Sequence, residues 1–170
     1  MPKAILITAN DIPKKTLTNG NVDPDLFVNY IEIAQDIHVQ NYLGTDLLEK
    51  CQSLITAGTL GDAGNEAYNT FVTTWTKPVL IHWSMVEYLS FAGYQVSDKG
   101  VFKHTSENAS NPDKFEVDAL IEKHRDYAEH YTQRLIDYLC NNTSSFSEYT
   151  SNTDEDMRAD KDTNFTGWYL

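Results

Sequence analysis

The chain has 170 residues, of which 41% are hydrophobic, so it suits one domain with a core of its own. Its formal net charge of −12 argues against a protein that grips nucleic-acid phosphates, since that requires clustered lysines and arginines. No segment approaches the ~18 apolar residues of a membrane span, and no signal peptide is recognisable. Cys51 and Cys140 lie among apolar residues at helical spacing, so we expect reduced thiols that pack inside a cytosolic protein.

An N-terminal arm is predicted over residues 1–22, because polar turn residues dominate it and its β-prone piece, Ile5–Ile7, is short. A first helix should follow, with Asp23 as its N-cap and Pro24 in its first position. Apolar residues then recur at steps of three and four as far as Gly44, where we expect the helix to end.

Further helices are predicted before residue 94. Thr45 is expected to cap a second helix that Gly58 stops. Asn65 should cap a third, and Pro78 either kinks that helix or starts a fourth. Residues 79–93 are apolar on nearly all sides, which predicts a helix that is central in the bundle or covered by another subunit.

A β-hairpin is predicted at about residues 94–104, in the middle of this helical chain. Two short β-prone runs flank a turn at residues 97–100, and a polar loop rich in serine and asparagine follows. Because a helical core does not need such a hairpin, we expect it to project and to contact another molecule.

The longest predicted helix follows this loop, with Asn111 or Ser110 as its N-cap and Pro112 in its first position. Its periodicity continues to residue 140, and about 29 residues at ~1.5 Å each give a rod of ~43 Å. We expect it to share one core with the earlier helices, so that Leu120→Ala should cost ~2–5 kcal/mol. The predicted core residues are Leu47, Leu48, Leu54, Phe71, Trp75, Leu80, Trp83, Leu120, Ile121, Ala128, Tyr131 and Leu135.

The periodicity stops at Asn141, and residues 141–170 contain six acidic and two basic residues among many Ser, Thr and Asn. This composition predicts an extended tail that is mobile in the free protein over residues 141–163. Four large apolar residues stand at its tip: Phe165, Trp168, Tyr169 and Leu170. Since such residues anchor interfaces, we expect the tip to order on a partner; the alternative is that it packs on its own bundle.

Together these elements predict a mainly α fold. It is a helical bundle of four to five helices with one long C-terminal helix, the inserted hairpin and extended arms at both ends. The chain is divided into an N-terminal arm (1–22), a helical domain (23–140) and the tail (141–170).

Catalytic and metal-binding groups do not cluster in the sequence. Motifs of zinc peptidases, redox dithiols, nucleotide-binding loops and serine hydrolases are missing. His124 and His130 share the long helix, but a spacing of six residues places them on different faces. His82, within the apolar helix, is interpreted as a core histidine. We therefore expect no enzyme, no metal and no cofactor.

Four segments, in their order and spacing, resemble one known family: YLGTDLLEKC (residues 42–51), KPVLIHWSMVEYL (77–89), VSDKGVFKHTSENAS (96–110) and YAEHYTQRLIDYLCNN (127–142). That family is uncharacterised and is encoded by phages and prophages of the Bacteroidales, including crAss-like phages. It is similar to the head–tail adaptor (connector) proteins of tailed bacteriophages. The resemblance covers residues 5–149.

The resemblance implies a virion structural protein that is made in the host bacterial cytoplasm. Such adaptors form a ring, usually of twelve copies, beneath the portal protein. The ring extends the DNA channel, through which DNA passes without sequence-specific binding, and offers a platform for the next tail or ring protein. A ring subunit needs two different complementary faces. The residues expected at these subunit or partner interfaces are Tyr94, Val96, Lys99, Val101, Phe102 and Lys103 of the hairpin and Phe165, Trp168, Tyr169 and Leu170 of the tip.

Two questions stay open at this level. The chain could instead be a small helical interaction module, a phage or host regulatory protein that forms no ring. Within the ring hypothesis, an acidic wall would repel passing phosphates, which predicts no affinity for duplex DNA at physiological salt. Alternatively, Lys99 and Lys103 line the channel and the acidic residues lie outside.

Overall fold

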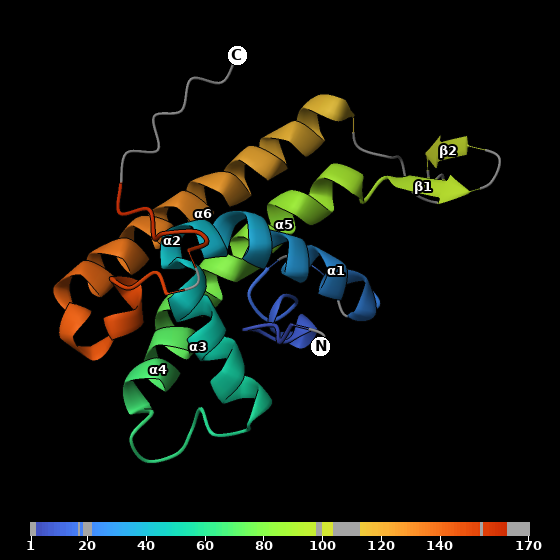
Figure 1. Ribbon diagram of the computed structural model, residues 1–170. Helices are drawn as coiled ribbons and strands as arrows, with labels where there is room; N and C mark the ends of the chain where they lie inside the picture. Colours follow the sequence, from blue (N-terminus) through green and yellow to red (C-terminus); the bar gives the residue numbers. More distant parts are fainter. Residues whose placement is uncertain are drawn as a thin grey trace.

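Four continuous helices build the body of the protein in the computed structural model (Figure 1). The structure describes residues 3–16, 18, 22–97, 100–103, 113–153 and 155–162, with the backbone alone at 95–97 and 100–103. The prediction of a mainly α fold is confirmed.

The first continuous helix consists of α1 (Asp25–Ala34), a π-helical segment η2 (Gln35–Val39) and α2 (Gln40–Leu43). The Asp23 carboxylate accepts a hydrogen bond of 3.0 Å from the backbone N–H of Asp25, as expected of a capping residue. Gly44, with φ of +74°, ends the helix where the sequence predicted.

The second helix, α3 (Thr45–Thr56), is followed by a third that runs through α4 (Glu66–Thr70), the π-helical segment η3 (Phe71–Thr76) and α5 (Lys77–Phe91). The third helix does not break at Pro78, which lies in the first turn of α5. Proline cannot donate a backbone hydrogen bond, and the wider π-helical turn directly before it accommodates this loss without ending the helix.

The fourth helix, α6 (Lys114–Asn141), has 28 residues and packs along α5. Its N-cap is Asp113, not Asn111 or Ser110 as predicted. The Asp113 carboxylate accepts the N–H of Glu116 at 2.9 Å, and the Glu116 carboxylate accepts the N–H of Asp113 at 3.0 Å. This reciprocal capping box satisfies two backbone groups at once, which a cap at 110 or 111 would not do.

The predicted core is confirmed apart from one residue. Eight of the twelve predicted residues are buried and three are partly buried, whereas Leu120 is 46% exposed. The first buried residue of α6 is Ala128, eight positions after Leu120. This spacing turns Leu120 about 80° away from Ala128, whereas its neighbour Ile121 packs against the core. The expected cost of Leu120→Ala is therefore wrong.

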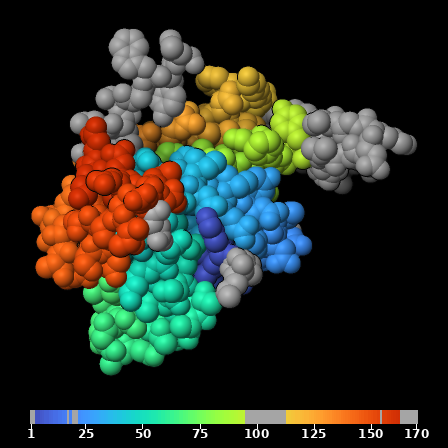
Figure 2. Space-filling view, viewed as in Figure 1, coloured from blue at the N-terminus to red at the C-terminus, as the bar shows by residue number. Residues whose placement is uncertain are grey.

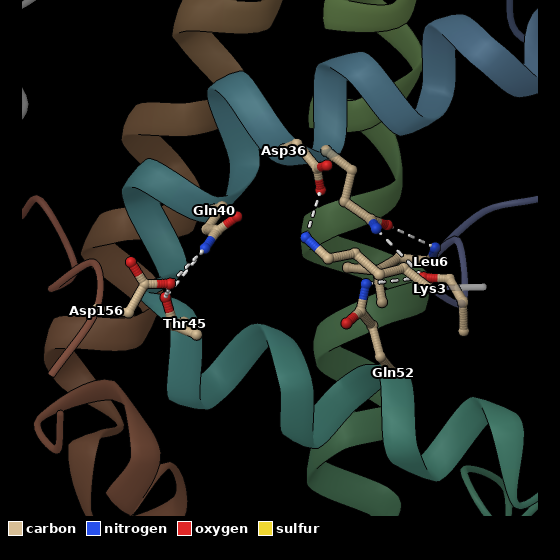
Figure 3. A network of polar contacts seen from close by, with 9 residues as sticks. Lys3, Leu6, Asp36, Gln40, Thr45, Gln52 and Asp156 are labelled. Atoms are coloured by element: carbon tan, nitrogen blue, oxygen red, sulfur yellow. Dashed lines mark hydrogen bonds and ion pairs between the residues drawn. The ribbon is translucent and has the colours of Figure 1, made fainter. Parts of the chain in front are cut away.

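The N-terminal arm belongs to the core, contrary to the sequence prediction. Leu6, Ile7 and a later residue, Ile12, are all buried. Two buried glutamine side chains hold the N-terminal arm (Figure 3). The Gln35 side chain accepts a hydrogen bond of 2.9 Å from the N–H of Leu6, and Gln35 and Gln52 donate hydrogen bonds of 3.2 and 3.0 Å to the carbonyl of Ala4. The β-prone piece thus pairs with side-chain amides instead of a strand.

The chain after α6 also returns to the body, so the predicted mobile tail is wrong for its described part. Two short 3-10 turns, η4 (Thr143–Ser145) and η5 (Ser147–Tyr149), follow α6. Phe146 and Tyr149 are 0% and 2% exposed. Figure 2 shows this orange-to-red segment lying against the cyan helices of the first half of the chain. Because the segment is otherwise polar, the sequence analysis did not predict that its two aromatic residues, Phe146 and Tyr149, would be buried.

The backbone forms a hairpin between α5 and α6, where β1 (Tyr94–Ser97) pairs antiparallel with β2 (Gly100–Lys103). Val96 is opposite Val101 in the register. Figure 1 shows the two strands standing beyond the ends of α5 and α6, away from the helical body.

Candidate interaction surfaces

The hairpin residues proposed from the sequence occupy a projecting element. Tyr94, at the start of β1, is 56% exposed, and a Cβ added at Gly93 would meet no atom within 4 Å. The backbone register also places Val96, Val101, Phe102 and Lys103 in the paired strands. Lys99 and the four residues of the tip, Phe165, Trp168, Tyr169 and Leu170, lie outside the described residues.

The N-terminal half of α6 connects the hairpin to the body and is only partly covered, through contacts such as those of Ile121 with the core and of His124 with His82. No described residue of α6 before Ala128 is buried. Large apolar side chains are instead turned outward here, with Phe115 80% exposed, Leu120 46% and Tyr127 43%. We call this half of α6 together with the hairpin the arm. These outward apolar side chains make the arm a candidate surface for contact with another molecule.

The first residue of α3, Thr45, holds the C-terminal segment against the body through its hydroxyl (Figure 3). The buried Thr45 hydroxyl donates to the Asp156 carboxylate at 2.9 Å and accepts from Gln40 Nε2 at 3.0 Å and from the Met157 N–H at 3.2 Å. All three hydrogen-bonding positions of the hydroxyl are used. The sequence predicted that Thr45 caps α3. Its side chain instead binds Asp156 and Met157. These two residues belong to the described residues 151–153 and 155–162, which we call the strap.

Backbone and carboxylate contacts extend the hold on the strap. The N–H of Thr45 donates to the Met157 carbonyl at 2.9 Å, and the N–H of Asp160 donates to the Asn41 carbonyl at 2.8 Å. The Asp46 carboxylate accepts hydrogen bonds from the Ser151 hydroxyl and from the Thr153 N–H and hydroxyl, and these bonds lower the pKa of Asp46.

Gly44 lets the strap pass closely over this loop. An added Cβ at Gly44 would lie 2.9 Å from the backbone nitrogen of Ala159. The glycine is thus required twice, for its positive φ and for the close approach of the strap backbone.

A histidine pair joins α5 to α6 at the edge of the core. His82 Nδ1 lies 3.1 Å from His124 Nδ1, and the His82 ring stacks on Tyr131 with an interplanar angle of 2°. Burial, and secondarily the neighbouring His124, lower the pKa of His82 to about 4. Both imidazoles are therefore neutral near pH 7, and the pair shares a hydrogen bond instead of offering a charged group. The sequence analysis interpreted His82 as a core histidine but did not identify this partner, because His124 comes from another helix.

Beside this pair is a shallow cleft of about 280 Å³. Its lining residues are Lys15, Thr73, Thr74, Lys77, Pro78, Ile81, His82 and Tyr131. The ammonium group of Lys77 is already paired with the Asp11 carboxylate at 3.2 Å.

Among the described residues, no three His, Cys, Asp or Glu side chains come close enough together to hold a metal ion. No helix in the same part of the chain combines the length and apolar character needed to cross a membrane. Cys51 and Cys140 are free thiols; Cys51 is buried, whereas Cys140 is exposed, so the predicted packing role is wrong for Cys140.

Comparison with known families shows that a single family model covers most of this architecture. The model of a family of unknown function, DUF6712, matches residues 39–158. The chain belongs to this family. The DUF6712 match begins in η2 and ends within the strap, so it includes Phe146, Tyr149 and the contacts around Thr45. No curated protein and no solved structure matches the chain.

Proposed function

We propose that this DUF6712 protein is a subunit of a head–tail adaptor ring in the virion of a tailed bacteriophage. The ring lies beneath the portal protein, extends the DNA channel and provides a platform for the next tail or ring component. On this proposal the protein has no enzymatic role.

The observation that carries the proposal is the arm. A helical body of this size buries its core without the hairpin, and α6 contributes no fully buried residue to that core before Ala128. The arm keeps Phe115, Leu120 and Tyr127 exposed to solvent in the single chain. A ring is built from heterologous contacts, in which one surface of each subunit meets a different surface of the next. The arm supplies one such surface, and the body supplies the other.

The charge of the chain agrees with a channel wall. A net charge of −12 on each copy repels the phosphates of passing DNA, so that DNA does not adhere during packaging or ejection. The isolated protein should accordingly show no measurable affinity for duplex DNA at physiological salt. Micromolar binding at that salt would instead favour a channel lined by Lys99 and Lys103.

The test of the proposal is the deletion of residues 95–103 with a short glycine linker in their place. The full-length and deleted proteins are compared by circular dichroism, and their assembly, alone and with the portal protein, by light scattering and negative-stain microscopy. We expect the deletion to leave the helical content unchanged and to abolish ring formation. A deleted protein that unfolds would show that the hairpin is a structural element. A full-length protein that forms no ring even with the portal would favour the small interaction module.

A further inference from the structure

The outward side of α6 carries two kinds of side chain on separate rows. One row repeats at steps of three and four residues and combines aromatic, apolar and basic residues without a carboxylate. We call it the α6 row, and its members are Leu120, Lys123, Tyr127, Tyr131, Arg134 and Tyr138. The neighbouring side of the helix carries exposed acids instead, among them Asp118, Glu122 and Asp126.

Both cations of the α6 row lie on aromatic rings. The Lys123 ammonium is 4.9 Å from the centroid of the Tyr127 ring, and the Arg134 guanidinium is 5.3 Å from that of Trp75. Trp75 in turn stacks on Tyr138 with centroids 4.4 Å apart. Tyrosine, tryptophan and arginine are the residues that dominate protein interfaces. The α6 row therefore has the composition of a docking surface, and its cations call for a partner that is both apolar and acidic.

The first continuous helix of the protein presents such a surface. Leu26, Ile33 and Ile37 are 53%, 40% and 60% exposed, and their spacing places them on one face. A parallel row of exposed polar residues, three of them acidic, lies beside them: Asp25, Asn29, Glu32 and Asp36. The sequence contains no lysine or arginine between residues 17 and 49. We call these two rows together the α1 face.

The α6 row and the α1 face match in length as well as in charge. Lys123 and Arg134 are eleven positions apart (123 to 134), as are Asp25 and Asp36 (25 to 36), so each pair spans about 16 Å along its helix. Asp36 pairs with Lys3 at 3.4 Å, but this ion pair is exposed and can be exchanged for another at little cost.

The two surfaces belong to different sides of α5, on which both helices pack. Tyr30 of α1 packs on Tyr88 with ring centroids 5.4 Å apart, whereas His124 of α6 is hydrogen-bonded to His82. Six positions along a helix turn two residues about 120° apart. The α6 row therefore cannot reach the α1 face of its own chain, and a contact between them joins two copies.

We propose that the α6 row of one copy binds the α1 face of the next. This inference rests on the proposed ring and names the two different surfaces that its heterologous contact requires. Burial of apolar side chains between the surfaces supplies the affinity, and the opposite charges set the orientation. The occupant is a second copy and not nucleic acid, because the acids beside the α6 row repel phosphates.

Charge reversal in the full chain tests the contact. One variant carries Lys123→Glu and Arg134→Glu in the α6 row. A second carries Asp25→Lys and Glu32→Lys in the α1 face, and a third combines all four changes. Because a variant that fails to fold cannot regain binding, the combined variant separates a lost contact from a damaged fold.

Two measurements are made on each variant, alone and with the portal protein. Sedimentation over a range of concentrations reports self-association. A carbodiimide, which joins carboxylates to nearby amines, is applied to a mixture of isotope-labelled and unlabelled copies, and mass spectrometry identifies the peptides linked between copies. The matched control carries Lys114→Glu and Asp118→Lys, on α6 but outside the α6 row.

We expect each reversed pair to weaken association at least several-fold, the combined variant to restore it, and the control to leave it unchanged. Lys123 of one copy should be linked to carboxylates of the α1 face of another. Association that resists both reversals would overturn this inference and leave the ring proposal standing. Association that follows the predicted pattern but yields no ring, even with the portal, would do the opposite.

Two further results would also overturn the inference. Copies that neither associate nor become linked, alone or with the portal, would refute both the contact and the ring. Binding of duplex DNA that is lost on Lys123→Glu would assign the α6 row to phosphates.

Discussion

Replacing Phe146 with alanine tests whether the chain after α6 is part of the folded core. The Phe146 side chain is fully buried, and its ring centroid lies 5.2 Å from that of Phe71 and 5.4 Å from that of Tyr68. Removal of a buried phenylalanine side chain costs about 3–5 kcal/mol through lost burial and the cavity that remains. Since domains of this kind are stable by ~5–15 kcal/mol, Phe146→Ala should remove a large part of the free energy of unfolding.

The assay is urea unfolding near pH 7, followed by circular dichroism. Phe115→Ala is the matched control, because Phe115 is 80% exposed on α6. It should change the free energy of unfolding by less than about 0.5 kcal/mol. If both variants were equally stable, the segment after α6 would not be packed in the core, and the original expectation of a mobile tail would be restored.

Three further predictions concern the strap, the N-terminal arm and the histidine pair. Gly44→Ala should lower the free energy of unfolding by about 1–3 kcal/mol through backbone strain alone, and should make the strap sensitive to protease. The control Gly61→Ala, with open space around its Cβ, should do neither. Equal behaviour of the two variants in urea unfolding and proteolysis would contradict the close approach of the strap backbone to Gly44. Gln35→Ala should lower the free energy of unfolding by about 1–3 kcal/mol, because it leaves the buried backbone N–H of Leu6, in the N-terminal arm, without its partner. Hydrogen exchange of the Leu6 amide should accelerate, and unchanged exchange would show that Gln35 does not hold the N-terminal arm. Because the pKa of His82 in the folded state, about 4, is below the ~6.5 of a free imidazole, the unfolded state binds more protons between these values, so stability is complete above about pH 6.5 and falls as the pH drops toward 4. Solvent reaches the pair, which limits the loss of the free energy of unfolding to about 1–2 kcal/mol. His82→Gln should reduce this pH dependence of stability, whereas the control His130→Gln should not. An identical pH dependence in both variants would exclude the histidine pair as its source.

Local chemistry in the sequence was sufficient to predict the helices and some of their ends, although not the N-cap of α6, which is Asp113. Asp23 and Gly44 act as start and stop signals of the first helix, and these signals can be read from the sequence because capping and positive φ involve only a few neighbouring residues. The same holds for the length of α6.

Contacts between distant residues decided most of what the sequence analysis missed. Phe146 packs on Phe71, 75 positions earlier, and the Tyr68 hydroxyl donates to Glu148, 80 positions later. Nothing in a polar stretch of Ser, Thr and Asn shows that its two aromatic residues will find such partners. The glutamines that hold the N-terminal arm, the Thr45 hydroxyl that binds the strap and the His82 pair follow the same rule. A single polar side chain carries no periodicity, so its partner is determined only when the packed helices bring the two together.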